Sequence, residues 1–172
     1  MPPPSSNAPE TVGVLSDTHL GECTAELLKV CETHFHDCER ILHAGDVVSL
    51  AVLRGLAPRW EVLAVRGNMD FAPDLRELPR RRVVQVGGLW VGLRHGDGGA
   101  GSIESRLLGE FGSRPPPAIV YGHTHEAADL TFQGVRLLNP GSPTDRRWAP
   151  YRSVARLTIN GDRIDFKIIA ID

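Results

Sequence analysis

Val12-Gly-Val-Leu-Ser-Asp-Thr-His19 joins a short apolar run directly to a polar cluster, and this arrangement recurs along the chain. An apolar run closed by a polar turn is typical of a buried strand that ends at the edge of a sheet. Four further clusters follow apolar runs in the same way: Gly45-Asp46, Gly67-Asn68-Met69-Asp70, His95-Gly96-Asp97 and Gly122-His123-Thr124-His125. Because strands of an open α/β sheet present their carboxyl ends at one edge, we expect the five clusters to converge.

The apolar runs predict buried strands in the first two-thirds of the chain, at residues 12–15, 41–44, 62–65, 89–93 and 118–121. Apolar residues at helical spacing between them predict helices at residues 24–34, 50–56 and 102–111. After residue 126, short turns separate four more strands and predict an antiparallel meander over residues 129–132, 135–138, 153–159 and 163–171. The predicted fold is therefore α/β, a four-layer α-β-β-α sandwich of two facing mixed β-sheets flanked by helices.

The composition is that of an ordinary folded protein, with 172 residues, 41% of them hydrophobic, and a net charge of −2. It has no basic excess that would indicate binding to nucleic acid or to a membrane surface. We expect a single domain over residues 10–172, preceded by a flexible tail at residues 1–9. Because neither a membrane-spanning stretch nor a secretory signal is evident, we also expect a cytoplasmic protein with no membrane partner.

Three cysteines, Cys23, Cys31 and Cys38, lie in and around the first predicted helix. Their odd number and their spacing do not fit a zinc ribbon or a redox dithiol, so we expect reduced thiols. Cys31 and Cys38 are seven positions apart, which places both on one helical face, where burial in the core is the ordinary explanation.

The polar clusters supply seven side chains that suit divalent metal ions, namely Asp17, His19, Asp46, Asn68, His95, His123 and His125. Carboxylate and amide oxygens together with imidazole suit manganese, iron, cobalt, nickel or zinc. Glycines at positions 45, 67, 96 and 122 let the backbone bend beside these residues and leave room for ions and substrate. Taken alone, any one of the seven is more often a turn cap or a surface group, and it is their joint occurrence that indicates a metal site.

Two divalent ions would also change the local charge of such a site. Set against two carboxylates and a bridging hydroxide, they leave a small positive charge by formal counting. An anionic phosphate is then attracted even though the whole chain is slightly acidic, because bound metals are the largest local charges in a site.

In this order the clusters resemble the calcineurin-like metallophosphoesterase superfamily, whose blocks are D-x-H, G-D, G-N-x-[DE], a single H and G-H-x-H. They look closest to its small prokaryotic phosphodiesterase branch. The resemblance extends from Val12 to the C-terminus and includes Asn139-Pro140-Gly141-Ser142, which is similar to a turn that follows the motifs in that branch. It implies a metallo-dependent phosphatase-like fold with two divalent metal ions, Mn²⁺ being favoured over Ni²⁺, Co²⁺, Fe²⁺ and Zn²⁺.

The resemblance also implies a role for each predicted ligand. One ion would be bound by Asp17, His19 and His125. The other would be bound by Asn68, His95 and His123, and Asp46 would bridge both. A hydroxide held between the ions would attack phosphorus in line while the ions neutralise the phosphoryl oxygens. The predicted catalytic residues are accordingly Asp46, Asn68 and, as an orienting group, Asp70.

The chain departs from the family pattern at two positions. Many phosphomonoesterases of the superfamily have histidine where this chain has Met69, and methionine cannot donate a proton to a leaving group. This departure favours a phosphodiesterase that hydrolyses a small soluble phosphodiester. A phosphomonoesterase or nucleotide phosphatase is the alternative enzyme, and a catalytically silent protein-interaction scaffold resembling the retromer subunit is the alternative of a different class. Asp97 stands where relatives often have a second histidine, which bears on substrate contacts there.

Other residues have two interpretations each. His43 either donates to a ligand carboxylate from behind or is an ordinary buried histidine. The arginines at 80–82 either meet a phosphate or form a solvated strand entrance, and Ser142 with the arginines at 146–147 either shapes a turn or touches substrate. Nucleic acid is not a favoured partner. A homodimer is a further alternative. Small relatives often dimerise, but the sequence shows no exposed apolar stripe that would demonstrate a dimer interface.

Overall fold

The structure, a computed structural model, describes residues 8–171, so most of the flexible tail predicted at residues 1–9 lies outside the described residues. Its elements, in chain order, are β1 (Glu10–Leu15), α1 (Ala25–Phe35), β2 (Arg40–His43), α2 (Leu50–Leu56), β3 (Glu61–Ala64), the 3₁₀ helix η1 (Pro73–Glu77), β4 (Arg81–Val86), β5 (Leu89–Arg94), α3 (Ile103–Glu110), β6 (Ala118–Val120), β7 (Ala128–Phe132), β8 (Val135–Asn139), β9 (Ser153–Asn160) and β10 (Arg163–Ala170). The three α-helices begin after Thr24, Ser49 and Ser102, whose side chains accept backbone N–H groups of the first turn.

The strands form two five-stranded mixed sheets, in the order β10-β9-β1-β2-β3 and β4-β5-β6-β8-β7. In the first sheet β1, β2 and β3 are parallel, and the β9–β10 hairpin joins β1 in antiparallel fashion. In the second sheet β5, β6 and β8 are parallel, with β4 and β7 antiparallel at the edges. Each sheet therefore contains three adjacent parallel strands, and parallel strands present their carboxyl ends at the same edge.

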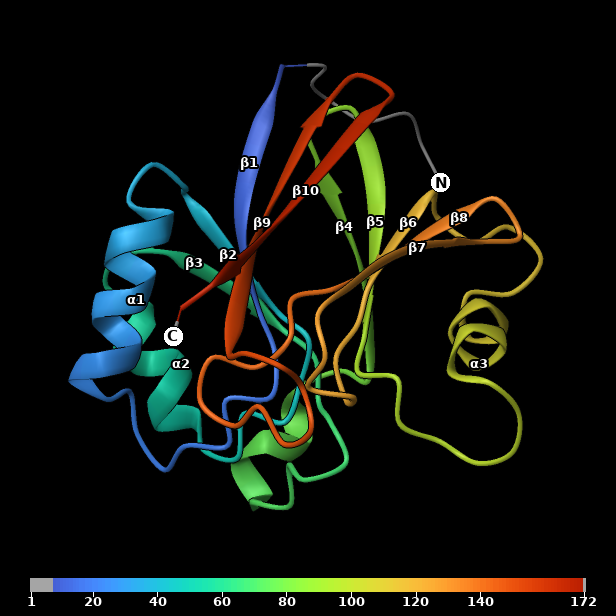
Figure 1. Cartoon of the computed structure of the whole chain (residues 1–172). Coiled ribbons are helices and arrows are strands. Elements are labelled where there is room, and N and C mark those ends of the chain that lie inside the picture. The colour runs from blue at the N-terminus through green and yellow to red at the C-terminus, as the bar shows by residue number, and fades with distance from the viewer. Residues whose placement is uncertain (1–7, 172) are drawn as a thin grey trace.

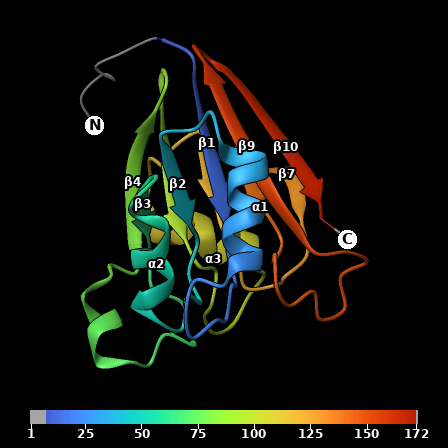
Figure 2. The same ribbon diagram turned by 90° about the vertical axis from the view of Figure 1, so that its left-hand side faces the viewer.

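The predicted four-layer α-β-β-α sandwich is confirmed. In Figure 1, α1 and α2 lie outside one sheet and α3 lies outside the other, while the sheets face each other; Figure 2 shows α1 and α2 in front of the strands. One core cluster fills the space between the sheets, a second lies beneath α1 and α2, and a third lies beneath α3. Burial on both faces explains why the central strands read as continuous apolar runs.

Strand β1 shows how alternation divides its side chains between two cores. Val12 and Val14 face the other sheet, whereas Leu15 packs beneath the helices. A Cβ atom at Gly13 would lie 2.6 Å from the ring of Phe35, so glycine at this position permits α1 to approach the sheet closely.

The predicted single meander after residue 126 is wrong. β7 and β8 form one hairpin in the second sheet, and β9 and β10 form another in the first sheet. Both hairpins are local, as the sequence predicts, but β8 packs beside β6 and β9 beside β1 through contacts distant in sequence. The sequence interpretation also omits η1 and, apart from its entrance at residues 80–82, strand β4.

All three cysteines are free, and Cys31 and Cys38 are buried in the core, as predicted. The predicted shared helical face is wrong, because α1 ends at Phe35 and Cys38 lies beyond it. Burial raises the pKa of the Cys31 thiol to about 12. Across residues 8–171, no helix is long and apolar enough to span a membrane.

Candidate metal centre

The five polar clusters converge where strands of both sheets end. Asp17 and His19 follow β1, Asp46 follows β2, and Asn68 follows β3. His95 comes directly after β5, and the histidines at 123 and 125 follow β6. The loops after β1, β2 and β3 gather at the lower edge of the molecule in Figure 1. The fold thus brings together side chains from segments that are up to 108 positions apart.

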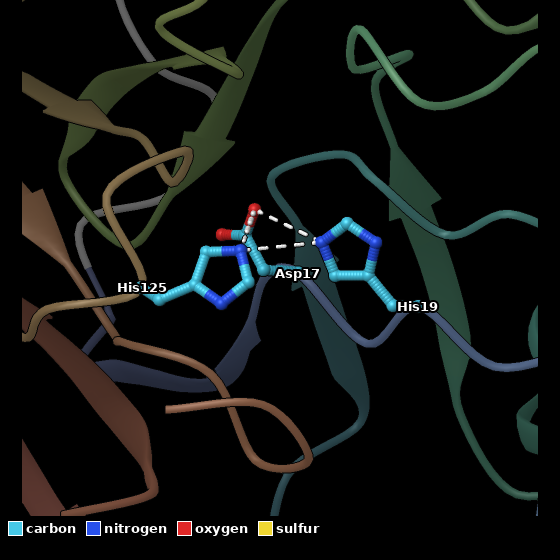
Figure 3. A group of neighbouring side chains, drawn as sticks. All are labelled: Asp17, His19 and His125. Atoms are coloured by element: carbon cyan, nitrogen blue, oxygen red, sulfur yellow. Dashed lines mark hydrogen bonds and ion pairs between the residues drawn. The ribbon is translucent and has the colours of Figure 1, made fainter. Parts of the chain in front are cut away.

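One group consists of Asp17, His19 and His125, whose potential ligand atoms all lie within 4.8 Å of one another. The Nε2 atoms of His19 and His125 are 3.2 Å apart and lie 3.8 and 3.4 Å from Oδ1 of Asp17. Figure 3 shows both imidazole rings directed at the carboxylate from different segments of the chain. Asp17 and His125 are completely buried, and His19 is partly open to solvent.

A second group lies beside the first and shares Asp17 with it: Asp17, Asp46 and His95. Oδ2 of Asp46 lies 3.3 Å from Nε2 of His95 in its own group and 3.5 Å from Nε2 of His19 in the first group, so this carboxylate also joins the two groups. On the solvent side, Oδ1 of Asn68 lies 3.1 Å from both Nε2 of His95 and Nδ1 of His123. All seven predicted ligands therefore belong to one continuous cluster.

The side chains of the cluster fit divalent cations because nitrogen and oxygen atoms with lone pairs face one another. The cluster has too few protons to link all of these atoms by hydrogen bonds. Nδ1–H of His95 donates to the carbonyl of Ala44 at 2.8 Å, which directs Nε2 at oxygens of Asp46 and Asn68. Nδ1 of His125 pairs with the carbonyl of Asp145 in the same way. Burial opposes protonation of His95, but Asp46 and Asp17 more than offset burial and raise the pKa of this imidazole, so that a bound cation would take the place of the proton between Nε2 and Asp46. Among the residues described, Oδ1 of Asp17 is a buried atom without a hydrogen-bond partner. A cation would satisfy these atoms together.

The carboxylates at the centre are held in the ionised form. Burial by itself raises the pKa of Asp17, but His19 and His95 more than offset burial and leave that pKa below its ordinary value. For Asp46, burial is likewise outweighed, chiefly by the hydrogen bond from His95, and the pKa is lowered. Burial lowers the pKa of His123, with a further contribution from His95, and so favours the neutral imidazole that binds metals.

The backbone of the cluster is strained. Positive φ angles occur at Asp17 (53°), His19 (46°), Asp46 (55°), His123 (73°) and His125 (62°). Residues other than glycine rarely adopt this left-handed conformation, and each instance costs on the order of 1–3 kcal/mol. The left-handed turns aim neighbouring side chains into one centre, which an extended strand with alternating side chains cannot do.

Glycines permit the close approach of these loops at two places. A Cβ atom at Gly67 would lie 2.1 Å from Oδ1 of Asp46, and one at Gly122 would lie 1.8 Å from Oγ of Ser16. Both distances are far below van der Waals contact. Glycine at 67 thus lets the loops after β2 and β3 of one sheet meet, and glycine at 122 lets the loop after β6 meet the end of β1 in the other sheet.

Asp70 lies behind the centre and holds the backbone of the neighbouring loops. Its Oδ2 accepts N–H groups of Asp46 and Gly67, at 3.1 and 2.7 Å, and its Oδ1 accepts that of Val48 at 2.7 Å. The side chain is 5% exposed. This arrangement is that of the orienting group that the sequence predicted, with both oxygens directed at backbone rather than at the mouth of the site.

The turn at residues 139–142 connects the loops from beneath. Oγ of Ser142 donates to the carbonyl of Asp17 at 2.7 Å, and the side-chain amide of Asn139 donates to the carbonyl of Gly122 at 3.0 Å. Both side chains are completely buried, so Ser142 shapes the site from below. The neighbouring Arg146 side chain is exposed and donates to the carbonyl of Pro150.

His43 is completely buried and links two ligand loops without touching a ligand carboxylate. Its Nδ1 accepts the N–H of Gly45 at 3.2 Å, and its Nε2 lies 3.1 Å from Oγ1 of Thr18. Burial lowers the pKa of this imidazole to about 4, so the ring is neutral at physiological pH. His43 is therefore a positioning residue, intermediate between the two interpretations of the sequence.

The three arginines at 80–82 have different environments. Arg81 lies over the ring of Phe111, and Nε of Arg82 donates to the carbonyl of Ala64 at 2.8 Å, so both are structural. Arg80 alone faces the mouth of the site, where it lies 3.4 Å from Asp97. Met69, which follows Asn68 in the sequence, has a side chain that is 40% exposed.

Sequence reasoning missed several groups that support the ligands. Oγ of Ser16 donates to Oδ2 of Asp17 at 2.7 Å, and its position directly before a predicted ligand was the available signal. The carbonyls of Ala44 and Asp145, which fix the orientation of two imidazole rings, carry no signal because every residue has a carbonyl. Arg66 and Arg76 beside Asn68 were missed because surface arginines are ordinarily solvated.

Comparison with known families gives a match over most of the chain. A family model described as the calcineurin-like phosphoesterase superfamily domain matches residues 11–162. A probable metallophosphoesterase of Methanocaldococcus jannaschii is 35% identical over 165 residues, which cover 94% of this chain and 81% of that protein. A second protein of the same organism, named a phosphodiesterase, is 27% identical over 144 residues, covering 76% of this chain and 82% of its own length.

Solved structures share the architecture. The vacuolar protein sorting 29 protein of Cryptosporidium parvum superposes with a TM-score of 0.73 over 95% of this chain and 92% of its own, at 22% sequence identity. At that level of identity the likeness concerns the fold.

Proposed function

The chain belongs to the calcineurin-like phosphoesterase superfamily, and from this premise we propose that it is a dinuclear metal-dependent phosphodiesterase acting on a small soluble phosphodiester. The observation that carries the proposal is the continuous cluster of seven ligand side chains, in which Asp46 stands between the imidazoles of His19 and His95. Two bound divalent ions supply a hydroxide nucleophile and neutralise charge on the phosphoryl oxygens.

In this proposal the seven ligands divide into two sets around one shared carboxylate. Asp17, His19 and His125 hold one ion, and Asn68, His95 and His123 hold the other, while Asp46 serves both. Their mixture of oxygen and imidazole donors suits Mn²⁺, with Ni²⁺, Co²⁺, Fe²⁺ and Zn²⁺ as alternatives. Asp70 holds the Asp46 backbone in place, and His43 fixes the loops that carry Asp17 and Asp46.

The preference for diesters is supported by the side chain at position 69. Met69 follows the ligand Asn68, and its backbone N–H donates to Oδ1 of Asp46 at 2.8 Å, but a thioether has no proton to donate to a departing oxygen. Leaving groups that depart without protonation, or receive a proton from another group, are therefore favoured. A relative named a phosphodiesterase is consistent with this preference.

The test is hydrolysis of bis(p-nitrophenyl) phosphate beside p-nitrophenyl phosphate, with chelator-stripped protein to which Mn²⁺, Ni²⁺, Co²⁺, Zn²⁺ or Mg²⁺ is returned. We expect metal-dependent cleavage of the diester at a higher kcat/KM than that of the monoester, and its loss in Asp46→Ala.

Three outcomes would contradict the proposal in different ways. A strong preference for the monoester would indicate a phosphomonoesterase or nucleotide phosphatase. Cleavage that persists unchanged in Asp46→Ala would place the reaction elsewhere. No hydrolysis of either ester by protein with two metals bound would favour a protein-interaction scaffold of the same fold.

A further inference from the structure

A pocket lined by three arginines opens directly beside the metal centre. It has a volume of about 270 Å³, near the lower end of small-ligand pockets, which begin at roughly 300 Å³. Asn68, whose Oδ1 lies 3.1 Å from two of the clustered imidazoles, forms part of its wall. The guanidinium groups come from Arg66 after β3, Arg76 in η1 and Arg80 before β4. A substrate bound at the metal centre can therefore extend into this pocket past Asn68.

Two of these guanidinium groups have little else to bind. Within residues 8–171, the Arg76 side chain makes no ion pair or hydrogen bond, and Nε of Arg66 is buried without a hydrogen-bond partner. The remaining contact of the Arg66 side chain is a long one, 3.4 Å from Nη1 to the carbonyl of Arg76. Like charges that share a small pocket repel one another, so an anion placed between them is stabilised.

Within the described part of the chain, the acidic residues of the pocket leave two of the three arginines, Arg66 and Arg76, without an ion pair. Asp70 directs both oxygens at backbone N–H groups. Asp97 pairs with the buried guanidinium of Arg94 through Oδ1, and its Oδ2 lies 3.4 Å from Arg80. Arg66 and Arg76 are left available to a ligand.

We propose that this arginine pocket binds a second phosphate group of the substrate, on the part of the molecule that extends past Asn68 from the phosphodiester at the metal centre. The proposal rests on the proposed phosphodiesterase function and narrows its substrate class to phosphodiesters that carry an additional phosphate. Guanidinium groups match phosphate because their planar forks donate paired N–H bonds to its oxygens. The exposed ring of Phe71, also in the lining, offers an apolar face to the group that links the two phosphates.

The test compares two substrates that differ only in the second phosphate. Thymidine 5′-(p-nitrophenyl phosphate) and its 3′-phosphorylated form have the same leaving group and the same nucleoside. In the metal-loaded enzyme we expect the 3′-phosphate to lower KM about tenfold with little change in kcat, the range expected for a charge-assisted contact. Arg76→Gln, a change at an exposed side chain, is expected to remove most of this preference, as is Arg66→Gln. Arg54→Gln, an exposed arginine on α2, should retain it.

Binding measured without turnover separates this proposal from the proposed function. By calorimetry, thymidine 3′,5′-bisphosphate should bind more tightly than thymidine 5′-phosphate, and Arg76→Gln should abolish the difference. If the enzyme cleaves both thymidine diesters equally well and binds both nucleotides equally, the pocket proposal is overturned while the phosphodiesterase proposal stands. If neither diester is cleaved but the bisphosphate still binds more tightly through Arg76, the catalytic proposal fails and the phosphate site stands.

Discussion

The carboxylate of Asp70 accepts the backbone N–H of Asp46 at 3.1 Å, so one acid fixes another that stands at the centre of the metal cluster. The same carboxylate also accepts N–H groups of Gly67 and Val48, and it thereby joins the loops after β2 and β3. Asp46 has a positive φ of 55°, a conformation that persists only when its surroundings impose it. Asp70 supplies part of that constraint.

Asp70→Ala is expected to destabilise the protein and to weaken metal binding together. Removal of the carboxylate leaves backbone N–H groups without acceptors, at a cost of about 1–3 kcal/mol for each one that stays buried. Asp70→Asn retains one oxygen of similar position and should lie between the wild type and Asp70→Ala. Urea unfolding of metal-free protein, followed by metal titration, measures both effects. Asp74→Ala, an exposed acid in η1, is the control, and equal stability of the two alanine variants would contradict the role given to Asp70.

Substitution of Asp46, the proposed shared ligand, should release more metal than substitution of a ligand that binds only one ion. Oδ2 of Asp46 lies within 3.5 Å of imidazole nitrogens from both groups, whereas His125 belongs to one. Asp46→Asn is therefore expected to lose both ions under conditions in which His125→Ala retains about one. Elemental analysis after dialysis measures the stoichiometry, and circular dichroism checks that each variant is folded. Equal losses from the two variants would show that Asp46 does not bridge.

The clustering of the candidate ligands was predictable from the sequence because its signal is local. Each strand and its polar cluster are contiguous in the sequence. The segment from Val12 to His19 therefore predicts both a buried strand and the ligands at its end. The division of the last four strands between two sheets was not predictable in this way, because β8 joins β6 and β9 joins β1 through long-range packing. The arginine pocket was missed for a similar reason. Arg66 and Arg76 meet only after η1 folds back beside Asn68, and nothing in their immediate sequence distinguishes them from solvated arginines.

Met69→His is expected to raise activity on monoesters with poor leaving groups. The backbone N–H of Met69 donates to Oδ1 of Asp46 at 2.8 Å, and its partly exposed side chain can be exchanged without disturbing that bond. An imidazole at this position can protonate a departing alkoxide, an effect typically worth about 10²–10⁴-fold. The measurement is kcat/KM for a series of phenyl and alkyl phosphates, with Met69→Gln as a polar control that cannot act as an acid. No gain in a folded, metal-loaded Met69→His protein would show that the residue at 69 is not limiting.

His43 should make the stability of the metal-free protein depend on pH in a defined window. Burial holds the pKa of the folded-state imidazole at about 4, against 6.5 for an ordinary histidine, with only partial compensation from Asp70 and Asp17. Between these values the unfolded chain binds a proton that the folded protein does not. The stabilising contribution is therefore complete above pH 6.5 and is lost as pH falls toward 4, by roughly 3 kcal/mol in all.

The comparison that isolates this effect is the change in unfolding free energy with pH, measured by urea titration between pH 7.5 and 4 with a chelator present. His43→Asn retains an acceptor for the N–H of Gly45 but does not titrate, so its stability should fall less steeply than that of the wild type across the window. Its lower stability at pH 7.5, from lost packing, does not affect the slope. Parallel curves for wild type and His43→Asn would show that the folded protein protonates His43 as readily as the unfolded chain does. That result would contradict the arrangement in which Nδ1 of His43 accepts the N–H of Gly45.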